Sequence, residues 1–284
     1  MAVPTCPLCG GALGASLLTI SEPDRFEKAA GVSADGYVRD WRECEGCHAA
    51  IDCLSEDSRT RLQALATNYY DVDVGAGRIG ERFQKITQLP ATQSDNKQRV
   101  KRIKGWLESL PAVDRPRRAL DIGAGLGVFL YEFLEPSWEG VAVEPDALAA
   151  AHLRTLEKFT VEQSLFDRSS QLGKFDFISL NKVIEHIERP HQLLADCRDS
   201  LAAPLGFVYV EVPDAETIGR RPSNDNILGA LHWHLHTAKS LTTLLEGVGF
   251  HILHLTRAYE PSGKISLCVL ATNAAGREFL ANKK

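Results

Sequence analysis

Two pairs of cysteines near the start of the chain have the spacing of a metal-binding site. Each pair has the form Cys-x-x-Cys with a turn-forming residue in or beside it, and the four members are Cys6, Cys9, Cys44 and Cys47. Each turn brings two thiolates to one ion at about 2.3 Å, and two turns complete a tetrahedron without substrate water. The pattern predicts a structural zinc ion, with a redox pair as the less favoured alternative. His48 or Cys53 could replace one ligand, although four cysteines are the simpler set.

A glycine-rich segment, residues 118–130, has the composition of a turn that holds a ligand. A short apolar strand ends at Asp121, and Gly123, Gly125 and Gly127 then lead into an apolar helical stretch. Glycine lets the backbone approach a ligand closely and adopt positive φ. The spacing does not fit the GxGxxG of nicotinamide dinucleotides, and a carboxylate at the mouth of the turn would repel a pyrophosphate. An acid there suits a ligand that carries a cationic ammonium group.

A second carboxylate follows the next predicted strand. Residues 140–143 form a short apolar run that leads to Glu144, Pro145 and Asp146. A carboxylate at such a strand end can accept both hydroxyls of a ribose. An ammonium group and free ribose hydroxyls together describe S-adenosylmethionine, which is therefore the predicted cofactor.

These residues resemble the first motif of the class I S-adenosylmethionine-dependent methyltransferases, an acidic residue followed by xGxGxG. The resemblance covers about residues 118–271 and implies a Rossmann-like, seven-stranded α/β sheet, with its fourth and fifth strands at 175–181 and 206–214. The usual acid after the third strand is absent, so recognition of adenine falls to Ser164 or to backbone groups. The implied cofactor site comprises Asp121, Gly123, Ala124, Gly125, Gly127, Glu144, Pro145, Ser164, Leu165 and Asn181.

A narrower resemblance concerns the acceptor. The cysteine pairs, the segment 184–187 and the histidine-rich segment 232–236 are similar to a bacterial subgroup that methylates sugars or related small molecules. Sugar C-methyltransferases of this kind carry Tyr-His-Glu-His where this chain has residues 231–234, so O-methylation is an equal expectation. The predicted acceptor is a sugar, a nucleotide-linked sugar or a related small molecule, with Trp233 and Tyr69–Tyr70 as candidate stacking surfaces.

Histidine and glutamate side chains supply the candidate catalytic groups. A hydroxyl acceptor must lose its proton during attack, and histidine titrates near neutrality. His234 and His186 are the predicted bases, with support of the loop as the alternative for His186. Glu185 is expected to orient His186 or to accept a substrate hydroxyl. Alternation in an extended segment would also place three histidines on one face, which raises a second metal site as an alternative: His232, His234 and His236.

The elements that must position these residues fall into three predicted regions. Residues 1–53 form a small zinc-binding lobe, and residues 54–117 form a helical connector. Residues 118–284 form the methyltransferase domain. One connector helix is expected to begin at Ser94 or Asp95, which are good N-cap residues.

Positive charge gathers in the connector. From residue 78 to residue 118 there are eleven Lys or Arg against four Asp or Glu, a local charge of +7. One interpretation is a solvated helix face. The other is a rim, including Arg99 and Arg102, that attracts the diphosphate of an activated sugar. A basic rim and a zinc lobe also leave an RNA base methyltransferase as a rival function.

Composition limits the remaining possibilities. The chain has 284 residues, 44% of them hydrophobic, and a net charge of −5, which excludes global disorder and a polybasic nucleic-acid coat. The sequence contains no long apolar run and no signal-peptide pattern, so we expect a cytoplasmic protein with reduced thiols and no membrane partner. Besides the RNA enzyme, a catalytically silent cofactor-binding module is an alternative function. The oligomeric state is not predicted.

Overall fold

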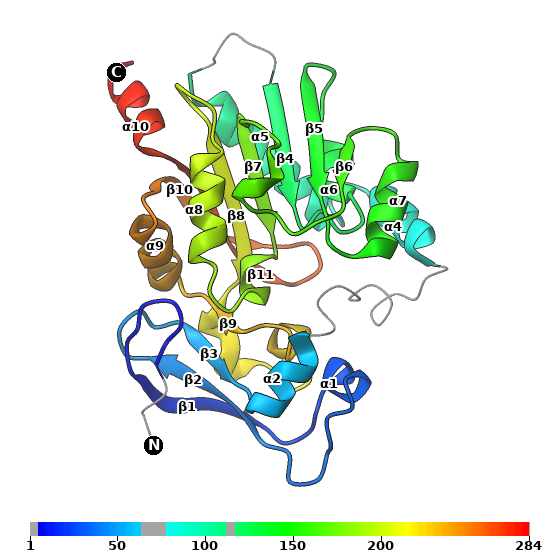
Figure 1. Cartoon of the computed structure of the whole chain (residues 1–284), viewed down its shortest axis with the longest axis vertical. Coiled ribbons are helices and arrows are strands. Elements are labelled where there is room, and N and C mark those ends of the chain that lie inside the picture. Colours follow the sequence, from blue (N-terminus) through cyan, green and yellow to red (C-terminus); the bar gives the residue numbers. More distant parts are fainter. Residues whose placement is uncertain (1–4, 64–77, 112–116, 284) are drawn as a thin grey trace.

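A seven-stranded sheet and a smaller four-stranded sheet organise the chain, as the computed structural model shows (Figure 1). The structure describes residues 5–63, 78–111 and 117–283. In spatial order, the strands of the large sheet are β10 (His251–Tyr259), β11 (Ile265–Thr272), β8 (Phe207–Pro213), β7 (Phe177–Asn181), β4 (Arg117–Ile122), β5 (Trp138–Val143) and β6 (Thr160–Glu162). Strands β4 to β8 are mutually parallel, whereas β11 runs antiparallel to both of its neighbours. The predicted seven-stranded α/β fold is confirmed.

Helices cover both faces of the large sheet, because its strands are apolar on both sides. One face packs against α8 (His191–Asp199) and α9 (Ala238–Gly247). The other packs against α5 (Asp95–Glu108), α6 (Val128–Phe133) and α7 (Ala147–Thr155). Consecutive residues in β4 divide between the two cores: Ala119 belongs to one and Leu120 to the other. Among the described residues, the remaining helices of four or more residues are α1 (Arg25–Ala29), α2 (Glu56–Gln63), α4 (Ile79–Thr87), the 3-10 helix η4 (Ala215–Arg220) and α10 (Ala274–Ala281).

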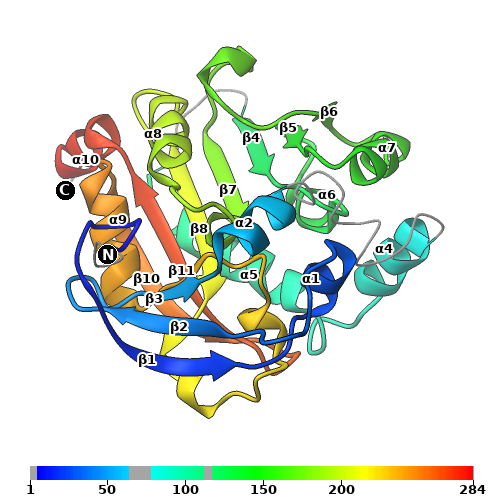
Figure 2. The same cartoon turned by 60° about the horizontal axis from the view of Figure 1, so that its bottom comes forward.

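The small sheet lies below the carboxyl ends of the parallel strands (Figures 1 and 2). Its order is β1 (Leu13–Ile20), β2 (Arg39–Cys44), β3 (Ala50–Cys53) and β9 (His234–Leu235). Strand β9 therefore joins the lobe although it lies far along the chain. The predicted boundary at residue 53 does not include this strand, and the division into three regions stays a prediction.

Residues 95–108 of the connector form helix α5. Ser94 is the N-cap of α5 and its hydroxyl accepts a hydrogen bond from the Lys97 amide, so the first of the two predicted cap residues takes that role. Asp95 instead binds the backbone and hydroxyl of Ser262. In the ranges described, no helix combines the length and apolarity needed to cross a bilayer.

A buried ion-pair network joins α5 to the middle of β8. Glu211 is fully buried, and Arg99 donates to both of its carboxylate oxygens at 2.8 and 2.7 Å. Arg102 and the Tyr209 hydroxyl also donate to it, at 3.2 and 2.6 Å. Burial alone would raise the pKa of Glu211, but Arg99 and Lys182 outweigh burial and the pKa falls below the usual range of a carboxyl.

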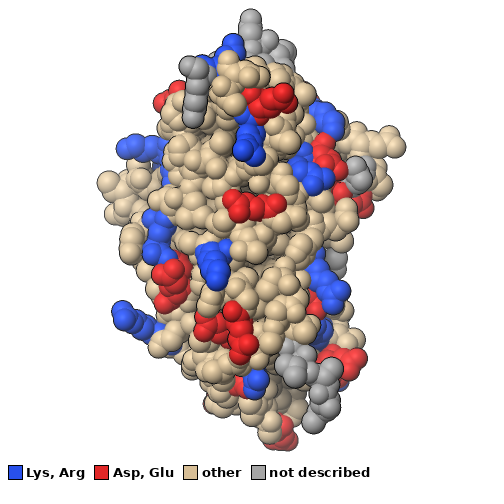
Figure 3. All heavy atoms as spheres, turned by 90° about the vertical axis from the view of Figure 1, so that its left-hand side faces the viewer, with Lys and Arg blue, Asp and Glu red and all other residues tan. Residues whose placement is uncertain are grey.

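This network corrects the interpretation of the basic connector. Arg99 and Arg102 are only 11% and 16% exposed, and they face a protein carboxylate rather than solvent. Both guanidinium groups are therefore engaged in ion pairs with Glu211 inside the protein, and they do not form a phosphate-attracting rim. On the face drawn in Figure 3, basic and acidic side chains alternate instead of gathering by sign.

The network predicts that Arg99→Glu destabilises the fold by about 3–5 kcal/mol, because it leaves Glu211 buried beside a second negative charge. Urea unfolding of the full chain measures this change. Lys101→Glu is the matched control, because Lys101 lies on the same helix and is exposed. Equal stability of the two variants, together with a raised KM for the acceptor in Arg99→Glu alone, would contradict the structural role.

Candidate active site and zinc centre

The glycine turn between β4 and α6 needs glycine for steric reasons. Gly123, Gly125 and Gly127 all have positive φ, at 66°, 56° and 75°. A Cβ on Gly123 would lie 2.8 Å from a methyl group of Val183, and one on Gly127 would lie 2.5 Å from a methyl group of Leu153. Side chains at these positions would therefore push the turn away from the loop after β7 and from α7. Ala124, between the first two glycines, is 7% exposed.

Asp121 lies at the carboxyl end of β4 and is held by the neighbouring strand. Its carboxylate accepts hydrogen bonds from the Ser179 hydroxyl at 2.6 Å and from the Asn181 amide at 3.1 Å. Burial raises the pKa of Asp121 to about 7, against the lowering effect of these two bonds. The Oδ1 atom of Asn181 is buried and has no partner in the described chain. Asn181 Oδ1, at the carboxyl end of β7, can therefore still accept a hydrogen bond. It lies beside the Asp121 carboxylate, whose negative charge a cation would stabilise.

Glu144 follows β5 and fixes the geometry of the turn. Its carboxylate accepts the Gly125 amide at 2.7 Å and the Asp146 amide at 2.9 Å. Burial raises its pKa, while these two amides lower it. Asp146 in turn caps α7, and Pro145 connects the two acids. The second strand-end acid therefore contacts the glycine turn directly, an arrangement that the sequence did not reveal.

Ser164 and Leu165, the predicted adenine contacts, follow β6. The Ser164 hydroxyl oxygen is buried and has no hydrogen-bond partner among the described residues. Leu165 is 73% exposed, which is unusual for a large apolar side chain. An unused hydroxyl and an uncovered apolar surface together fit an aromatic heterocycle with polar edges.

A carboxylate and two imidazoles meet in the loop after β7. Glu185 and His186 belong to the 3-10 helix η3 (Ile184–His186), and His232 comes from the segment before β9. One potential ligand atom from each lies within 4.8 Å of the others. Burial raises the pKa of Glu185 to about 7 and lowers the pKa of His186 to about 3. The structure therefore brings together two of the three predicted catalytic residues and adds His232.

His234, the third predicted catalytic residue, is fully buried. Its Nε2 donates to the Ile187 carbonyl at 2.9 Å, and burial lowers its pKa to about 4. Its ring packs against His236, whereas His232 packs against His186. The three alternating histidines thus do not share one site. The role of His234 as a base stays a prediction, and in this conformation its Nε2 is occupied by the Ile187 carbonyl.

The histidine-rich segment holds the two sheets together. The Trp233 amide donates to the Glu185 carbonyl at 2.8 Å, and the Asp52 amide donates to the Trp233 carbonyl at 3.0 Å. His234 pairs with Ile51 of β3. Sequence reasoning missed this contact, because nothing local indicates that a two-residue strand joins a distant sheet. Tyr69–Tyr70 lie outside the described residues.

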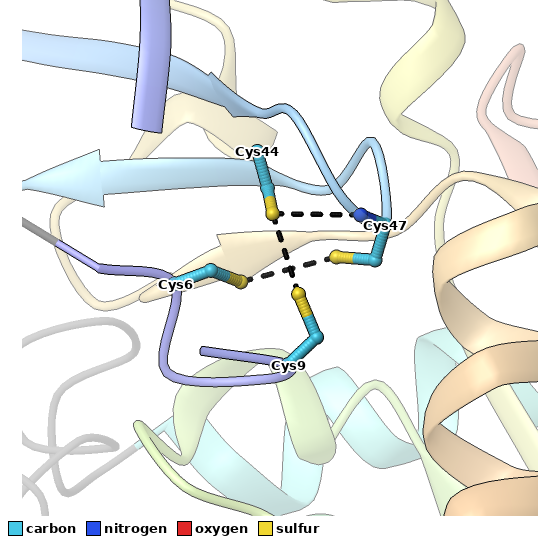
Figure 4. Close-up of side chains that lie close together, drawn as sticks. All are labelled: Cys6, Cys9, Cys44 and Cys47. Carbon is cyan, nitrogen blue, oxygen red and sulfur yellow. Dashed lines mark hydrogen bonds between the residues drawn. The ribbon is translucent and has the colours of Figure 1, made fainter. Parts of the chain in front are cut away.

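The four predicted zinc ligands converge at one end of the small sheet (Figure 4). The sulfur atoms of Cys6 and Cys47 lie 3.8 Å apart, and those of Cys9 and Cys44 lie 3.4 Å apart. Sulfurs at 2.3 Å from a tetrahedral ion are about 3.8 Å apart, so the cluster has the size of a zinc site. The predicted cysteine cluster is present, and the donor set fits structural zinc.

Two further contacts support thiolate character in this cluster. The Leu8 amide points at the Cys6 sulfur, and the Cys47 amide points at the Cys44 sulfur, at 3.4 and 3.5 Å. A backbone N–H group directed at a cysteine sulfur stabilises the thiolate form. His48 instead contacts Glu43 on the surface, so this alternative ligand is bound elsewhere. Cys197 and Cys268 are fully buried in the two apolar cores that flank the large sheet.

Comparison with known proteins agrees with this geometry. The sequence model of a family described as "Methyltransferase domain" matches residues 94–255. The chain belongs to this methyltransferase family. Together with the fold, the match makes it an S-adenosylmethionine-dependent methyltransferase of class I, as predicted. The match begins at α5, so this connector helix is part of the family domain.

Solved structures show the same fold at low sequence identity. Magnesium protoporphyrin IX methyltransferase from Synechocystis PCC 6803 with bound SAH superposes with a TM-score of 0.53 at 14% identity, over 75% of this chain and all of the other. The pyocyanin biosynthetic protein PhzM gives 0.51 at 19% identity, over 75% of this chain and 64% of the other. The comparison with curated proteins found no match.

The four cysteines are predicted to hold one zinc ion that stabilises the lobe. Cys44→Ser should lose this ion and unfold the small sheet, because metal binding supplies folding free energy in so small a unit. Metal analysis and near-ultraviolet circular dichroism of the full chain measure both effects. Cys53→Ser, in the same lobe but outside the cluster, is expected to keep the zinc. Full zinc content in Cys44→Ser would exclude the four-cysteine site.

Proposed function

We propose that this enzyme transfers the methyl group of S-adenosylmethionine to a hydroxyl, or to a carbon, of a sugar, a nucleotide-linked sugar or a related small molecule. The observation that carries the proposal is the group formed by Glu185, His186 and His232. It follows β7 in the chain, and the carboxyl ends of parallel strands are where ligands bind in doubly wound sheets.

In this proposal, each part of the cofactor has a candidate partner in the chain. Asp121 would balance the ammonium group, with Asn181 beside it. Glu144 would accept the ribose hydroxyls, and Ser164 and Leu165 would contact adenine. When bound, S-adenosylmethionine supplies a methyl group on a positively charged sulfur, which is already a good leaving group.

In this proposal, Glu185 activates the acceptor. Its pKa near 7 lets the carboxylate accept a proton at neutral pH, whereas His186, with a pKa of about 3, is a weak base. Glu185 would take the proton of the acceptor hydroxyl on one of its carboxylate oxygens. His186 and His232, as neutral rings, would orient that hydroxyl.

A groove between the lobe and the start of α8 suits a polar acceptor. It has a volume of about 870 Å³, and its walls include Asp52, Arg42, Arg59 and Trp233. Arg59 stacks over the Trp233 ring at 5.1 Å. The guanidinium groups of Arg42 and Arg59 would donate to acceptor hydroxyls, whereas Asp52 is buried in an ion pair with Arg39. An aromatic wall packs against a sugar ring. The zinc-binding lobe would thereby form one wall of the acceptor site.

A methyl-transfer screen tests the proposed function. The zinc-loaded enzyme is incubated with labelled S-adenosylmethionine and with nucleotide sugars, RNA or small phenols. Transfer to nucleotide sugars is the expected result. Transfer to RNA alone would replace the proposal with an RNA enzyme, and tight cofactor binding without turnover on any acceptor would indicate a silent module.

Cofactor affinity is expected to fall as pH decreases below about 7. The anionic form of Asp121 balances the ammonium group, and protonation below its raised pKa removes that charge, so the Kd should rise up to about tenfold per pH unit. Calorimetry between about pH 5.5 and 8 measures the effect.

Two variants identify the group responsible. Asp121→Asn should bind weakly at every pH, whereas Asp176→Asn, at the opposite end of the sheet, should keep the wild-type profile. A pH dependence that survives in Asp121→Asn would assign the titration to another group.

Removal of the proton acceptor should lower turnover without affecting the cofactor. Glu185→Gln keeps the side-chain shape, and we expect kcat to fall by ~10²-fold or more at unchanged cofactor Kd. Glu139→Gln is the control, because Glu139 is exposed at the amino end of β5. Near-wild-type kcat in Glu185→Gln would remove this residue from the mechanism.

A further inference from the structure

We infer that Glu185, His186 and His232 bind one divalent transition-metal ion, at a site separate from the four cysteines. The three side chains offer one carboxylate oxygen and two imidazole nitrogens, all within 4.8 Å of one another. Ligand atoms around a tetrahedral ion at 2.1 Å are about 3.4 Å apart, so small side-chain rotations would complete the site.

The hydrogen bonds of the two imidazoles favour metal binding. Nδ1 of His186 donates to the Leu231 carbonyl at 3.0 Å, and Nδ1 of His232 donates to the Ile227 carbonyl at 2.7 Å. A carbonyl only accepts, so each neutral ring carries its lone pair on Nε2, the atom that binds the metal in this tautomer. Metal-binding histidines are commonly fixed in this way through their other nitrogen.

Glu185 supplies an independent reason for a cation. Its side chain is fully buried, and neither carboxylate oxygen has a hydrogen-bond partner within the described chain. The nearby Lys182 ammonium group is directed elsewhere, to the Ser266 hydroxyl at 2.5 Å and to Glu211 at 3.6 Å. A buried carboxylate without partners is costly, and direct coordination by an ion would satisfy it.

The donor set narrows the choice of ion. Two imidazoles and one carboxylate suit Zn²⁺, Fe²⁺ or Co²⁺, whereas Mg²⁺ and Ca²⁺ prefer oxygen ligands alone. Three protein ligands also leave at least one coordination position open, in contrast to a closed four-cysteine site. The inferred ion can therefore bind a ligand from solution.

The role of this ion rests on the proposed function and changes one step of it. An acceptor hydroxyl in the open position would have a lowered pKa, and its proton would leave to water. Glu185 would then act as a ligand of the ion rather than as the proton acceptor. The site itself depends only on the three side chains.

Metal stoichiometry tests the site directly. The full chain is dialysed to equilibrium against micromolar Zn²⁺ and its metal content is measured, with circular dichroism as the check on folding. Wild type and His251→Ala, a control histidine in β10, should hold two ions per chain. Glu185→Gln and His232→Ala should hold one, with at least tenfold weaker binding of the second. One ion in wild type, or two in Glu185→Gln, would overturn the inference.

Spectroscopy and activity separate this inference from the proposed function. Co²⁺ added to protein with zinc-filled cysteines should give weak visible bands and no thiolate charge-transfer band. A charge-transfer band would place the second ion on sulfur and overturn the site.

Loss of methyl transfer by at least tenfold after mild chelation, with recovery on Zn²⁺ addition, supports the catalytic role. Unchanged transfer would overturn that role and leave the proposed function standing. Two bound ions without methyl transfer to any acceptor would support the site but contradict the proposed function.

Discussion

The backbone hydrogen bonds of residues 231–236 are the interaction on which the rest of the arrangement depends. This short segment donates to the loop after β7 on one side and pairs with β3 of the small sheet on the other. The next contact, from the Ala215 amide to the His236 carbonyl, ties the same segment to the end of β8. One strand of two residues thereby fixes the zinc-binding lobe over the carboxyl edge of the large sheet. Because backbone bonds are directional, this also fixes where His232 meets Glu185.

Burial also determines which charged side chains are paired inside the protein. The cations of α5 that looked free in the sequence neutralise Glu211 inside the domain, whereas Asp121, Glu144 and Glu185 have raised pKa values near the strand ends. We propose that Asp121 and Glu185, which have little neighbouring positive charge, bind ligands that supply it. A cationic cofactor and an inferred metal ion are the two kinds of partner that would supply it.

Much of the fold and part of the site were predictable because they depend on local pattern. The glycine turn, the acids at the ends of β4 and β5, and the Ser94 cap follow from residue type and spacing over a few positions. The phosphate-rim interpretation of Arg99 failed because its partner, Glu211, lies far along the chain and only packing brings them together. The grouping of three alternating histidines failed for a related reason: the segment is extended only at β9, so His232 and His234 meet different neighbours.

Short-range spacing in the sequence determined the cofactor class and the two cysteine pairs, and the resemblance carried by the glycine motif implied the seven-stranded methyltransferase fold. Tertiary structure alone decided which side chains around the strand ends are buried, which carboxylates keep unsatisfied oxygens, and that β9 completes the sheet of the lobe. These properties arise from contacts between residues distant in the chain, and the free energy of burying a charge depends on the neighbours that packing provides.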